Sequence, residues 1–512
     1  MGVLILITAL TAWRYRLPAL AEESTEGFSG ARAMATLKRL LPNDKPHPRG
    51  SAEQAAVIGR LVEILEEIGL EPETQNATAC APAGLLSHDP CGDVQNVLVH
   101  FPGETEETVL ISAHTDSVEN SPGAGDDGQG VAILVEMARY LKPRAHENSV
   151  TLLFTDGEES GLLGAVAFIE GHPLAARVAA AVNVEARGQS GLSTLFRTAG
   201  EDAWLIDLYA ENAPRPFTSS VHQVVFETMP HHTDLSIWEH FGIPGVDFAF
   251  IDRPEAYHTM LDTVDRLEPR SVQSQGDNVL AMLRGLATAD LARPARGHAG
   301  WFDVMGVGVV HWPLPATLWF CLLGFSLTVV RGFTHRKAGE LRLRELGVAA
   351  VFLLLSLAGS VLGAWGLTFL PFGLQHWPAA LLVVGTIVAW TLWFAQRTRR
   401  TSPLSLHICA CLFFTLASLP IALWWPGVAY LLVLPPVFSN MGWVTSLRWP
   451  SSAVPVSALV GLFISGVLSL PLLEGLRIAL GAASVVPGAA GLSLVLMWAL
   501  PLWRFARGEE TP

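Results

Sequence analysis

The feature that most constrains this chain is a series of long apolar segments after residue 312. An α-helix needs about 20 apolar residues to cross the hydrocarbon core of a bilayer. About seven segments are long enough, at residues 313–330, 346–369, 377–395, 404–424, 427–446, 452–470 and 482–503. The sequence therefore predicts a multi-pass, all-α membrane domain over residues 304–512, with the lipid bilayer as its partner.

The charged residues divide the chain at nearly the same place. From Val304 onward there are 12 basic and 5 acidic residues, against 21 basic and 42 acidic residues in the part before it. The front part is therefore strongly acidic, and this charge would repel the phosphates of a nucleic acid. We expect no nucleic-acid partner, and the front part is long enough to bury a core of its own.

Basic residues between the apolar segments predict an orientation in the membrane. If the segments alternate in direction, only Arg477 falls on one side. The other side carries Arg331, Arg336, Lys337, Arg342, Arg344, Arg397, Arg399, Arg400, Arg448, Arg504 and Arg507. Cytoplasmic loops are enriched in Lys and Arg, so we expect a cytoplasmic C-terminus and an extracytoplasmic front domain, periplasmic or lumenal. Few charges lie within the segments, which favours a plain anchor over a transport pathway.

The first residues form a further short apolar run, from Gly2 to Trp13. It is shorter than a membrane span and lacks a basic start, so residues 1–21 are interpreted as either a signal peptide or a signal-anchor. Both interpretations imply export of the front domain, although Arg14 and Arg16 oppose the predicted orientation.

Residues 22–294 have the pattern of an α/β domain that ends in a Pro/Gly/Arg linker at 292–300. Ser51 and Gln54 form a capping box before a helical apolar pattern. Strands are predicted at 97–101, 109–112, 150–154, 180–184 and 246–251, and helices between them at 130–141 and 162–169. This alternation predicts a mixed, mostly parallel sheet flanked by helices.

The five cysteines are too few for a disulfide scaffold. Cys80 and Cys91 flank a short Pro- and Gly-bearing stretch and would be able to pair in an oxidising compartment. The other three lie within apolar segments, where buried thiols are the simpler interpretation.

Acids and histidines come after the predicted strands one after another. They are His114 and Asp116, the pair Asp126 and Asp127 in a glycine-rich turn, the pair Glu158 and Glu159, then Glu185, and His258. Open α/β sheets build their sites at the carboxyl ends of the strands. Each motif alone is weak, since a His-x-Asp or a glycine-rich turn usually has a structural role. In a metal site, the two adjacent glutamates would have different roles, one as a metal ligand and the other as a general base.

Taken in order, these residues resemble the zinc aminopeptidase family M28. The segment His232-Thr-Asp234 with Phe241-Gly-Ile-Pro244 is also similar to the family, and the resemblance covers residues 33–267. It implies a zinc-exopeptidase fold and a peptide substrate. Because a multi-span half comes after this domain, the chain is most similar to the membrane-bound members, of the vacuolar membrane protease and endoplasmic-reticulum metallopeptidase type.

The resemblance implies two zinc ions per chain. Asp126 would bridge them, with His114 and Glu185 on one ion and Glu159 and His258 on the other. Counting back from Gly130 favours Asp126 over Asp127 as the bridge. Many members have Asp at the position of Glu185, and either carboxylate suits zinc.

The resemblance also implies roles beyond the metal ligands. Glu158 would be the general base, and Asp116 would accept a hydrogen bond from the far ring nitrogen of His114. Asp234 is either a similar supporting acid or an ordinary surface residue. Arg187 either binds a substrate carboxylate or oxyanion, or forms a structural ion pair. Tyr257 either donates to the tetrahedral intermediate or only packs.

These residues favour a membrane-anchored dizinc aminopeptidase. Two alternatives stay open. Related proteins act as carboxypeptidases or cyclise N-terminal glutamine, and others are non-catalytic receptor or transport proteins on the same scaffold. Retention of both the ligands and the base disfavours the non-catalytic alternative.

Overall fold

The computed structural model describes residues 2–22, 27–86, 89–229, 231–292, 294, 296–367, 385, 396, 401–445, 450–480 and 485–506. The chain divides into two compact units. We call Tyr15–Pro313 the α/β unit, and Met1–Arg14 together with Leu314–Pro512 the helical unit.

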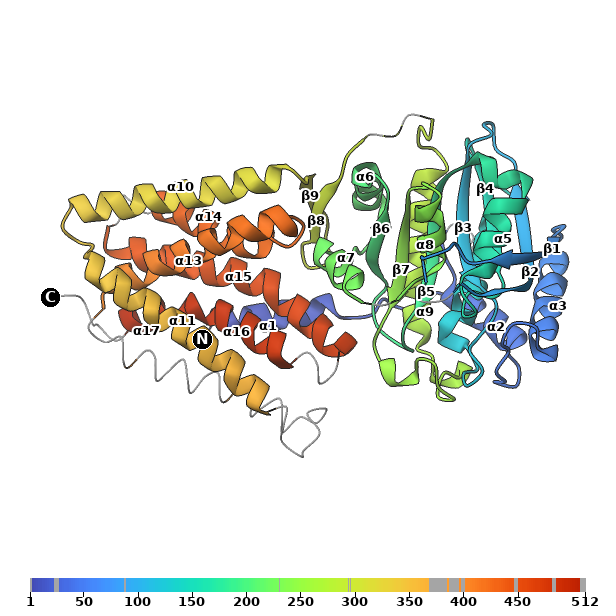
Figure 1. Cartoon of the computed structure of the whole chain (residues 1–512), viewed down its shortest axis with the longest axis horizontal. Helices are drawn as coiled ribbons and strands as arrows, with labels where there is room; N and C mark the ends of the chain where they lie inside the picture. Colours follow the sequence, from blue (N-terminus) through green and yellow to red (C-terminus); the bar gives the residue numbers. More distant parts are fainter. Residues whose placement is uncertain are drawn as a thin grey trace. The chain divides into compact units, whose positions relative to one another are not determined.

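A seven-stranded mixed sheet forms the centre of the α/β unit. Its order is β1-β2-β4-β3-β5-β7-β6, so β1 and β6 are the edges (Figure 1). The four central strands run parallel to one another, whereas β1, β2 and β6 pair antiparallel with their neighbours. The strands are β1 Glu73–Cys80, β2 Cys91–Phe101, β3 Thr108–His114, β4 Ser149–Thr155, β5 Val178–Ala186, β6 Thr194–Ala199 and β7 Gly245–Phe250.

Helices cover both faces of this sheet. Successive side chains of a strand point to opposite faces, so a buried strand contributes to the core on each side. On β3, Val109 and Ile111 join the core formed with α2, α3, α4, α6 and α9, whereas Leu110 joins the core with α5 and α8. The helices are α2 Gly30–Leu40, α3 Ala52–Glu67, α4 Gln129–Leu141, α5 Leu163–Gly171, α6 Ala203–Asn212, α7 Ser220–Glu227, α8 Asp234–His240 and α9 Pro269–Leu286.

The predicted fold class is confirmed, and so are the five predicted strands and the helices between them. The capping box is also present in part, since the Ser51 hydroxyl accepts from the backbone N–H of Gln54 at 3.0 Å. The two edge strands were not predicted. β1 reads ETQNATAC and is half exposed, so it lacks the apolar run that marks a buried strand.

The α/β unit extends through Pro313, past the boundary expected near residue 294. A hairpin of β8 Ala299–Asp303 and β9 Val309–Pro313 comes after the expected linker. Trp301 anchors it, because its ring is buried and its indole N–H donates to Thr218 Oγ1 at 2.8 Å.

The helical unit is entirely helical where it is described. Its helices are α1 Gly2–Arg14, α10 Ala316–Lys337, α11 Leu343–Leu367, α13 Pro403–Trp424, α14 Tyr430–Thr445, α15 Pro450–Leu480, α16 Val485–Met497 and α17 Ala499–Ala506. Four of them, α10, α11, α13 and α15, contain stretches long and apolar enough to cross a membrane. The predicted span at 427–446 forms the 16-residue α14, and the last predicted span is divided between α16 and α17.

Part of the predicted topology lies outside the described residues. This is so for nearly all of the span at 377–395 and for Arg397, Arg399, Arg400, Arg448 and Arg507. The interpretation of Arg331 as a loop residue is wrong. α10 continues through it to Lys337, and its side chain is fully buried. Its guanidinium donates hydrogen bonds to Asn440 and Ser457 on neighbouring helices, so a charged group lies inside the helical bundle.

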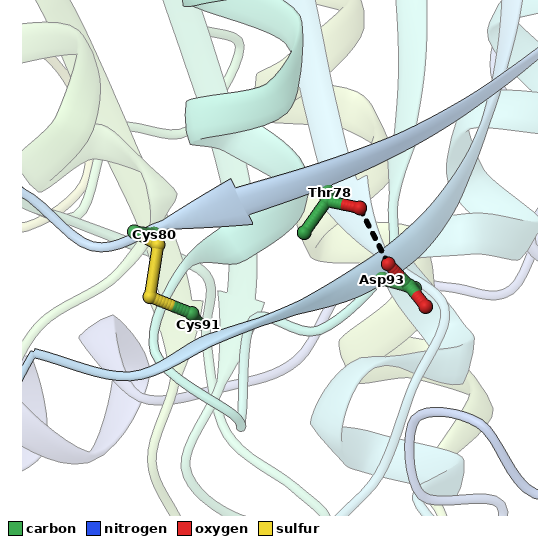
Figure 2. The surroundings of a disulfide bond; sticks show 4 residues. All are labelled: Thr78, Cys80, Cys91 and Asp93. Atoms are coloured by element: carbon green, nitrogen blue, oxygen red, sulfur yellow. Dashed lines mark hydrogen bonds between the residues drawn. A yellow bond between two sulfur atoms is a disulfide. The ribbon is translucent and has the colours of Figure 1, made fainter.

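Cys80 and Cys91 are joined by a disulfide between β1 and β2, beside the Thr78–Asp93 hydrogen bond (Figure 2). The two cysteines are directly paired across the strands. In the loop that the disulfide closes, Leu86 and Pro90 pack against Gly161. Cys321, Cys409 and Cys411 are free and buried.

We predict that replacing Cys80 and Cys91 by Ser destabilises the α/β unit by about 3 kcal/mol, because the unfolded chain loses the constraint of a short closed loop. Thermal unfolding of the wild-type chain with and without reductant measures this effect. Reductant is expected to lower the melting temperature of the wild type and to leave that of the double variant unchanged. Equal sensitivity of both proteins to reductant would contradict the prediction.

Candidate metal centre

Six chemically active side chains meet at the carboxyl edge of the parallel strands. His114 ends β3, Glu158 and Glu159 come after β4, and Glu185 lies near the end of β5. The other two come from loops, Asp126 from the turn before α4 and His258 from the segment after β7. Four neighbouring strands therefore deliver residues that lie far apart in the sequence to one place.

The Asp126 carboxylate lies between the two histidines. Its Oδ1 is 3.1 Å from His114 Nε2, and its Oδ2 is 3.1 Å from His258 Nε2. Glu185 Oε2 is 3.7 Å from His114 Nε2, and Glu159 Oε1 is 3.1 Å from His258 Nε2. Two three-residue groups thus share one aspartate.

The neighbouring Asp127 faces away from this cluster. Its Oδ1 accepts from the Gln129 side chain at 2.8 Å and from the backbone N–H of Gly130 at 3.2 Å. Its Oδ2 accepts from the backbone N–H of His114 at 3.3 Å. Asp127 therefore supports the turn, and Asp126 is the member of the pair that presents its carboxylate to both histidines.

Asp262 holds the turn that carries Asp126. Its Oδ1 accepts from the backbone N–H of Gly125 at 2.8 Å, and its Oδ2 accepts from that of Asp126 at 3.1 Å. The Gln189 side chain also donates to Oδ1, at 3.0 Å. This buried acid lies four residues after His258, so one loop supplies both an imidazole and the clamp for Asp126.

Asp116 orients three residues, but not by the contact that we expected. The ring Nδ1–H of His114 donates to the backbone carbonyl of Asp116 at 2.9 Å, whereas the Asp116 carboxylate is 3.6 Å from that nitrogen. The carboxylate instead accepts from the backbone N–H groups of Glu158 and Glu159, at 3.0 and 3.3 Å. The backbone carbonyl of Asp116 thus lies closer to the ring than its carboxylate does.

The acids of the cluster are hard to ionise together. Burial and the nearby Asp126 raise the pKa of Glu159 to about 7, and burial raises that of Glu185 to about 8, with Asp126 and Asp247 adding repulsion. Burial, together with repulsion from Glu185 and Glu159, also raises the pKa of Glu158 well above its usual value. These shifts describe a site with an excess of buried negative charge.

The donor set fits two divalent cations. His114, Asp126 and Glu185 form one group whose potential ligand atoms lie within 4.8 Å of one another, and Asp126, Glu159 and His258 form a second. His258 Nε2 and Glu159 Oε1 are buried and have no hydrogen-bond partner of good geometry among the described residues. No described Lys or Arg forms an ion pair with Asp126, Glu158, Glu159 or Glu185. Imidazole nitrogens and carboxylate oxygens are the ligands that zinc accepts, and two such ions would neutralise the cluster.

Tyr257 and Arg187 lie at the rim of the cluster. The Tyr257 ring stacks on the His258 ring at 3.8 Å, and the Arg187 guanidinium lies 5.6 Å from the Tyr257 ring centre. Burial and the neighbouring carboxylates raise the pKa of the Tyr257 hydroxyl, so it stays protonated and able to donate. No ion pair of Arg187 occurs among the residues that the structure describes.

Asp234 is a buried supporting acid rather than a surface residue. Its Oδ2 accepts from the Thr155 hydroxyl at 2.5 Å, and Thr155 is the last residue of β4. Burial raises the pKa of Asp234 to about 6. Its other oxygen has no hydrogen-bond partner in the part of the chain that the structure describes.

Several supporting residues were not predicted from the sequence. Gln275 donates to the backbone carbonyl of Glu185 at 2.6 Å, and Asp247 accepts from the side chains of Asn183 and Thr233, at 3.1 and 2.6 Å. Among the supporting residues that were missed, only Asp262 could have been found from the sequence, because it lies four residues after His258. Gln275 acts on a backbone carbonyl, and such a contact leaves no residue pattern in the sequence.

The chain resembles known proteins over its α/β unit. A model of peptidase family M28 matches residues 96–283. Endoplasmic reticulum metallopeptidase 1 of Rattus norvegicus is 36% identical over 324 residues, which cover 58% of this chain and 36% of the rat protein. The vacuolar membrane protease of Candida albicans is 30% identical over 254 residues, which cover 49% of this chain and 30% of that protein. A crystal structure of a glutaminyl cyclase from an Acidobacteriales bacterium is 23% identical with a TM-score of 0.42, and the match covers 53% of this chain and 99% of the cyclase.

The match therefore spans about a third of the length of these curated relatives. The matched residues include the whole cluster, from His114 to His258. In addition, four long apolar helices come after the matched part, as expected for an integral membrane protein. By these findings the α/β unit carries a peptidase family M28 segment at residues 96–283, and the chain is similar to membrane-type relatives of that family.

Proposed function

We propose that this chain is a membrane-anchored dizinc aminopeptidase that removes residues from the N-terminus of peptides. The observation that carries the proposal is the position of Asp126, whose two carboxylate oxygens each lie 3.1 Å from a different histidine. A carboxylate placed in this way suits a bridge between two metal ions, and each histidine has a glutamate beside it.

Asp126, His114 and Glu185 would hold one zinc ion, and Asp126, Glu159 and His258 would hold the other. Bound zinc supplies Lewis-acid chemistry, because it polarises a carbonyl group and makes a water molecule more acidic. The remaining requirements fall on the chain itself. It must accept a proton from the attacking water, return a proton to the leaving amine, and orient the peptide.

Glu158 is placed to move the proton. Its backbone is fixed by the Asp116 carboxylate, so its side chain starts from a defined position next to the ligand Glu159. The carboxylate takes a proton from water as the water attacks the scissile carbonyl, and then gives that proton to the leaving amine nitrogen.

Tyr257 and Arg187 would orient the substrate at the rim. The protonated Tyr257 hydroxyl is able to donate to the oxyanion that forms as the carbonyl is attacked. The cationic Arg187 is near enough to this ring to attract a carbonyl or carboxylate of the substrate. The carboxylates of the cluster favour a cationic α-amino group, which supports the N-terminal end of a peptide as the bound end.

We further propose that the α/β unit lies outside the cytoplasm and the C-terminus inside it. Basic residues, among them Arg336 and Lys337, lie at the end of α10 and in the segment after it. They support this orientation, because cytoplasmic loops are enriched in Lys and Arg. The disulfide between Cys80 and Cys91 also supports an oxidising compartment for the α/β unit.

Replacing Glu158 by Gln is predicted to lower kcat by about 10²- to 10⁴-fold, because the amide cannot accept the proton of the attacking water. Zinc content should stay at two ions per chain, since Glu158 is not among the proposed ligands. Hydrolysis of peptides with a free N-terminus by the full-length protein, together with metal analysis, tests both points. Glu170→Gln, on the exposed surface of α5, is the matched control and should retain activity.

The same assay distinguishes the alternatives. Cleavage of peptides with a blocked N-terminus and a free C-terminus would indicate a carboxypeptidase, and cyclisation of N-terminal glutamine would indicate a cyclase. Bound zinc with no turnover of any of these peptides would reject the enzymatic proposal.

Ligand variants should remove zinc in a graded way. His258→Ala is expected to leave about one zinc ion per chain, because it disrupts only the group with Glu159. Asp126→Ala is expected to reduce binding at both positions, because both groups share this residue. Metal analysis after dialysis measures the stoichiometry, and equal loss in the two variants would contradict the shared-aspartate arrangement.

The metal-free protein should become less stable as the pH rises from 5 to 8. Glu159 and Glu185 have pKa values of about 7 and 8 in the folded chain, against about 4.3 in an unfolded one. The folded state therefore binds more protons over this range, and its stability falls as these groups ionise. His258, with a pKa raised to about 10 by Asp126 and Glu159, acts in the same direction.

Thermal unfolding with a chelator and with added zinc measures this dependence. Zinc should raise the melting temperature more at pH 8 than at pH 5, because a cation stabilises the ionised carboxylates. An equal effect of zinc at both pH values would argue against a metal centre built from these residues.

A further inference from the structure

A second polar cluster lies inside the helical unit, where four helices meet. Arg331 of α10 is fully buried there. Its Nη2 donates to Ser457 Oγ of α15 at 3.1 Å, and its Nη1 donates to Asn440 Oδ1 of α14 at 3.4 Å. The Asn440 amide donates in turn to Thr328 Oγ1, one helical turn before Arg331.

His407 of α13 completes the cluster. Its Nε2 lies 3.0 Å from Ser439 Oγ and 3.3 Å from Ser457 Oγ. The two hydroxyl hydrogens are already used, since Ser439 donates to the Ser457 carbonyl at 2.8 Å and Ser457 to the Val454 carbonyl at 3.0 Å. The imidazole must therefore be the donor, so that Ser457 Oγ receives both the guanidinium and the imidazole N–H.

The cluster has donors and a positive charge but no described counter-charge. After residue 314 the chain has five acidic residues. Three of them have partners elsewhere, Glu340 with His335, Glu345 with Ser402 and Ser405, and Glu474 with Arg477. The other two, Glu509 and Glu510, lie outside the described residues. Within the described part of the chain, Arg331 Nε also has no hydrogen-bond partner.

A buried charge without a counter-charge is strongly unfavourable in the interior of a membrane protein, and such residues usually mark a site. The position of Arg331 along α10 indicates what would neutralise it. It lies six residues before Lys337, or about 9 Å from the basic end of the helix, which also carries His335 and Arg336. Basic pockets between helices at this depth suit anionic lipid headgroups.

We infer that Arg331, His407, Ser439, Asn440 and Ser457 form a binding site for the phosphate group of an anionic phospholipid that enters from the basic end of α10. A guanidinium matches two phosphate oxygens with parallel N–H donors. The Asn440 amide has a second hydrogen beyond the one given to Thr328 and supplies a neutral donor beside it, while His407 holds Ser457 in place. Inorganic phosphate shares this chemistry, so the source of the phosphate group is part of the test. This inference does not depend on the peptidase proposal.

The test uses the full-length protein purified in mild detergent. Native mass spectrometry measures the phospholipid that is retained after incubation with phosphatidylglycerol, and radiolabelled inorganic phosphate is added to delipidated protein in a parallel sample. Arg331→Gln is compared with Arg477→Gln, an exposed arginine on α15 that pairs with Glu474 and has no part in the proposed site. We expect Arg331→Gln to reduce retained phosphatidylglycerol at least tenfold, and Arg477→Gln to leave it within twofold of the wild type.

Arg331→Lys keeps the charge if the Gln variant does not fold. Lysine lacks the planar guanidinium with its parallel N–H donors, so lipid retention should still fall several-fold in this variant. Binding of inorganic phosphate that depends on Arg331, without lipid retention, would keep the phosphate site but assign it to a soluble ligand. Equal lipid retention in the wild type and in folded Arg331 variants would overturn the inference. Loss of stability in a Glu509→Gln/Glu510→Gln variant with no retained lipid would overturn it too, because the chain would then supply its own counter-charge.

Discussion

The burial of several carboxylates around two imidazoles is the constraint on which the α/β unit depends. Asp126, Glu158, Glu159 and Glu185 repel one another where little water can screen them. The fold resists this repulsion by fixing backbone groups rather than by adding cationic side chains. Asp262 holds the turn of Asp126, and Gln275 holds the strand of Glu185. Hydrogen bonds to the backbone thus hold Asp126 and Glu185 in place, and the proposed cations would balance their charge.

The two units bury charge in opposite ways. The α/β unit gathers acids around positions that suit cations, whereas the helical unit surrounds one guanidinium with neutral oxygens. Both clusters lie where several elements converge, at the ends of parallel strands in one case and between four helices in the other. In each unit, the polar centre links elements that are distant in sequence, so local stability and the proposed ligand binding would depend on the same contacts.

Much of the α/β unit could be predicted because its signals are local. Apolar runs marked the central strands, and acids or histidines directly after them marked the site edge. β1 was missed because it is half exposed and carries no apolar run. β6 is buried, but polar residues interrupt the apolar ones in its sequence TLFRTA. Asp116 was expected to use its carboxylate on His114, but its backbone carbonyl contacts the ring and its carboxylate accepts from the Glu158 amide, which residue order does not encode. Arg331 was misplaced because a charge after an apolar run is typical of a loop, and only packing between helices reveals its burial.

The single carboxylate of Asp116 holds the amides of two adjacent glutamates with different tasks. The proposed ligand and the proposed base thus differ by their order along one short turn and share one support. Insertion of one residue before Glu158 would move Glu158 to the proposed ligand position and displace Glu159 from it. We therefore expect the length of this turn to matter as much for the site as the identity of its two glutamates.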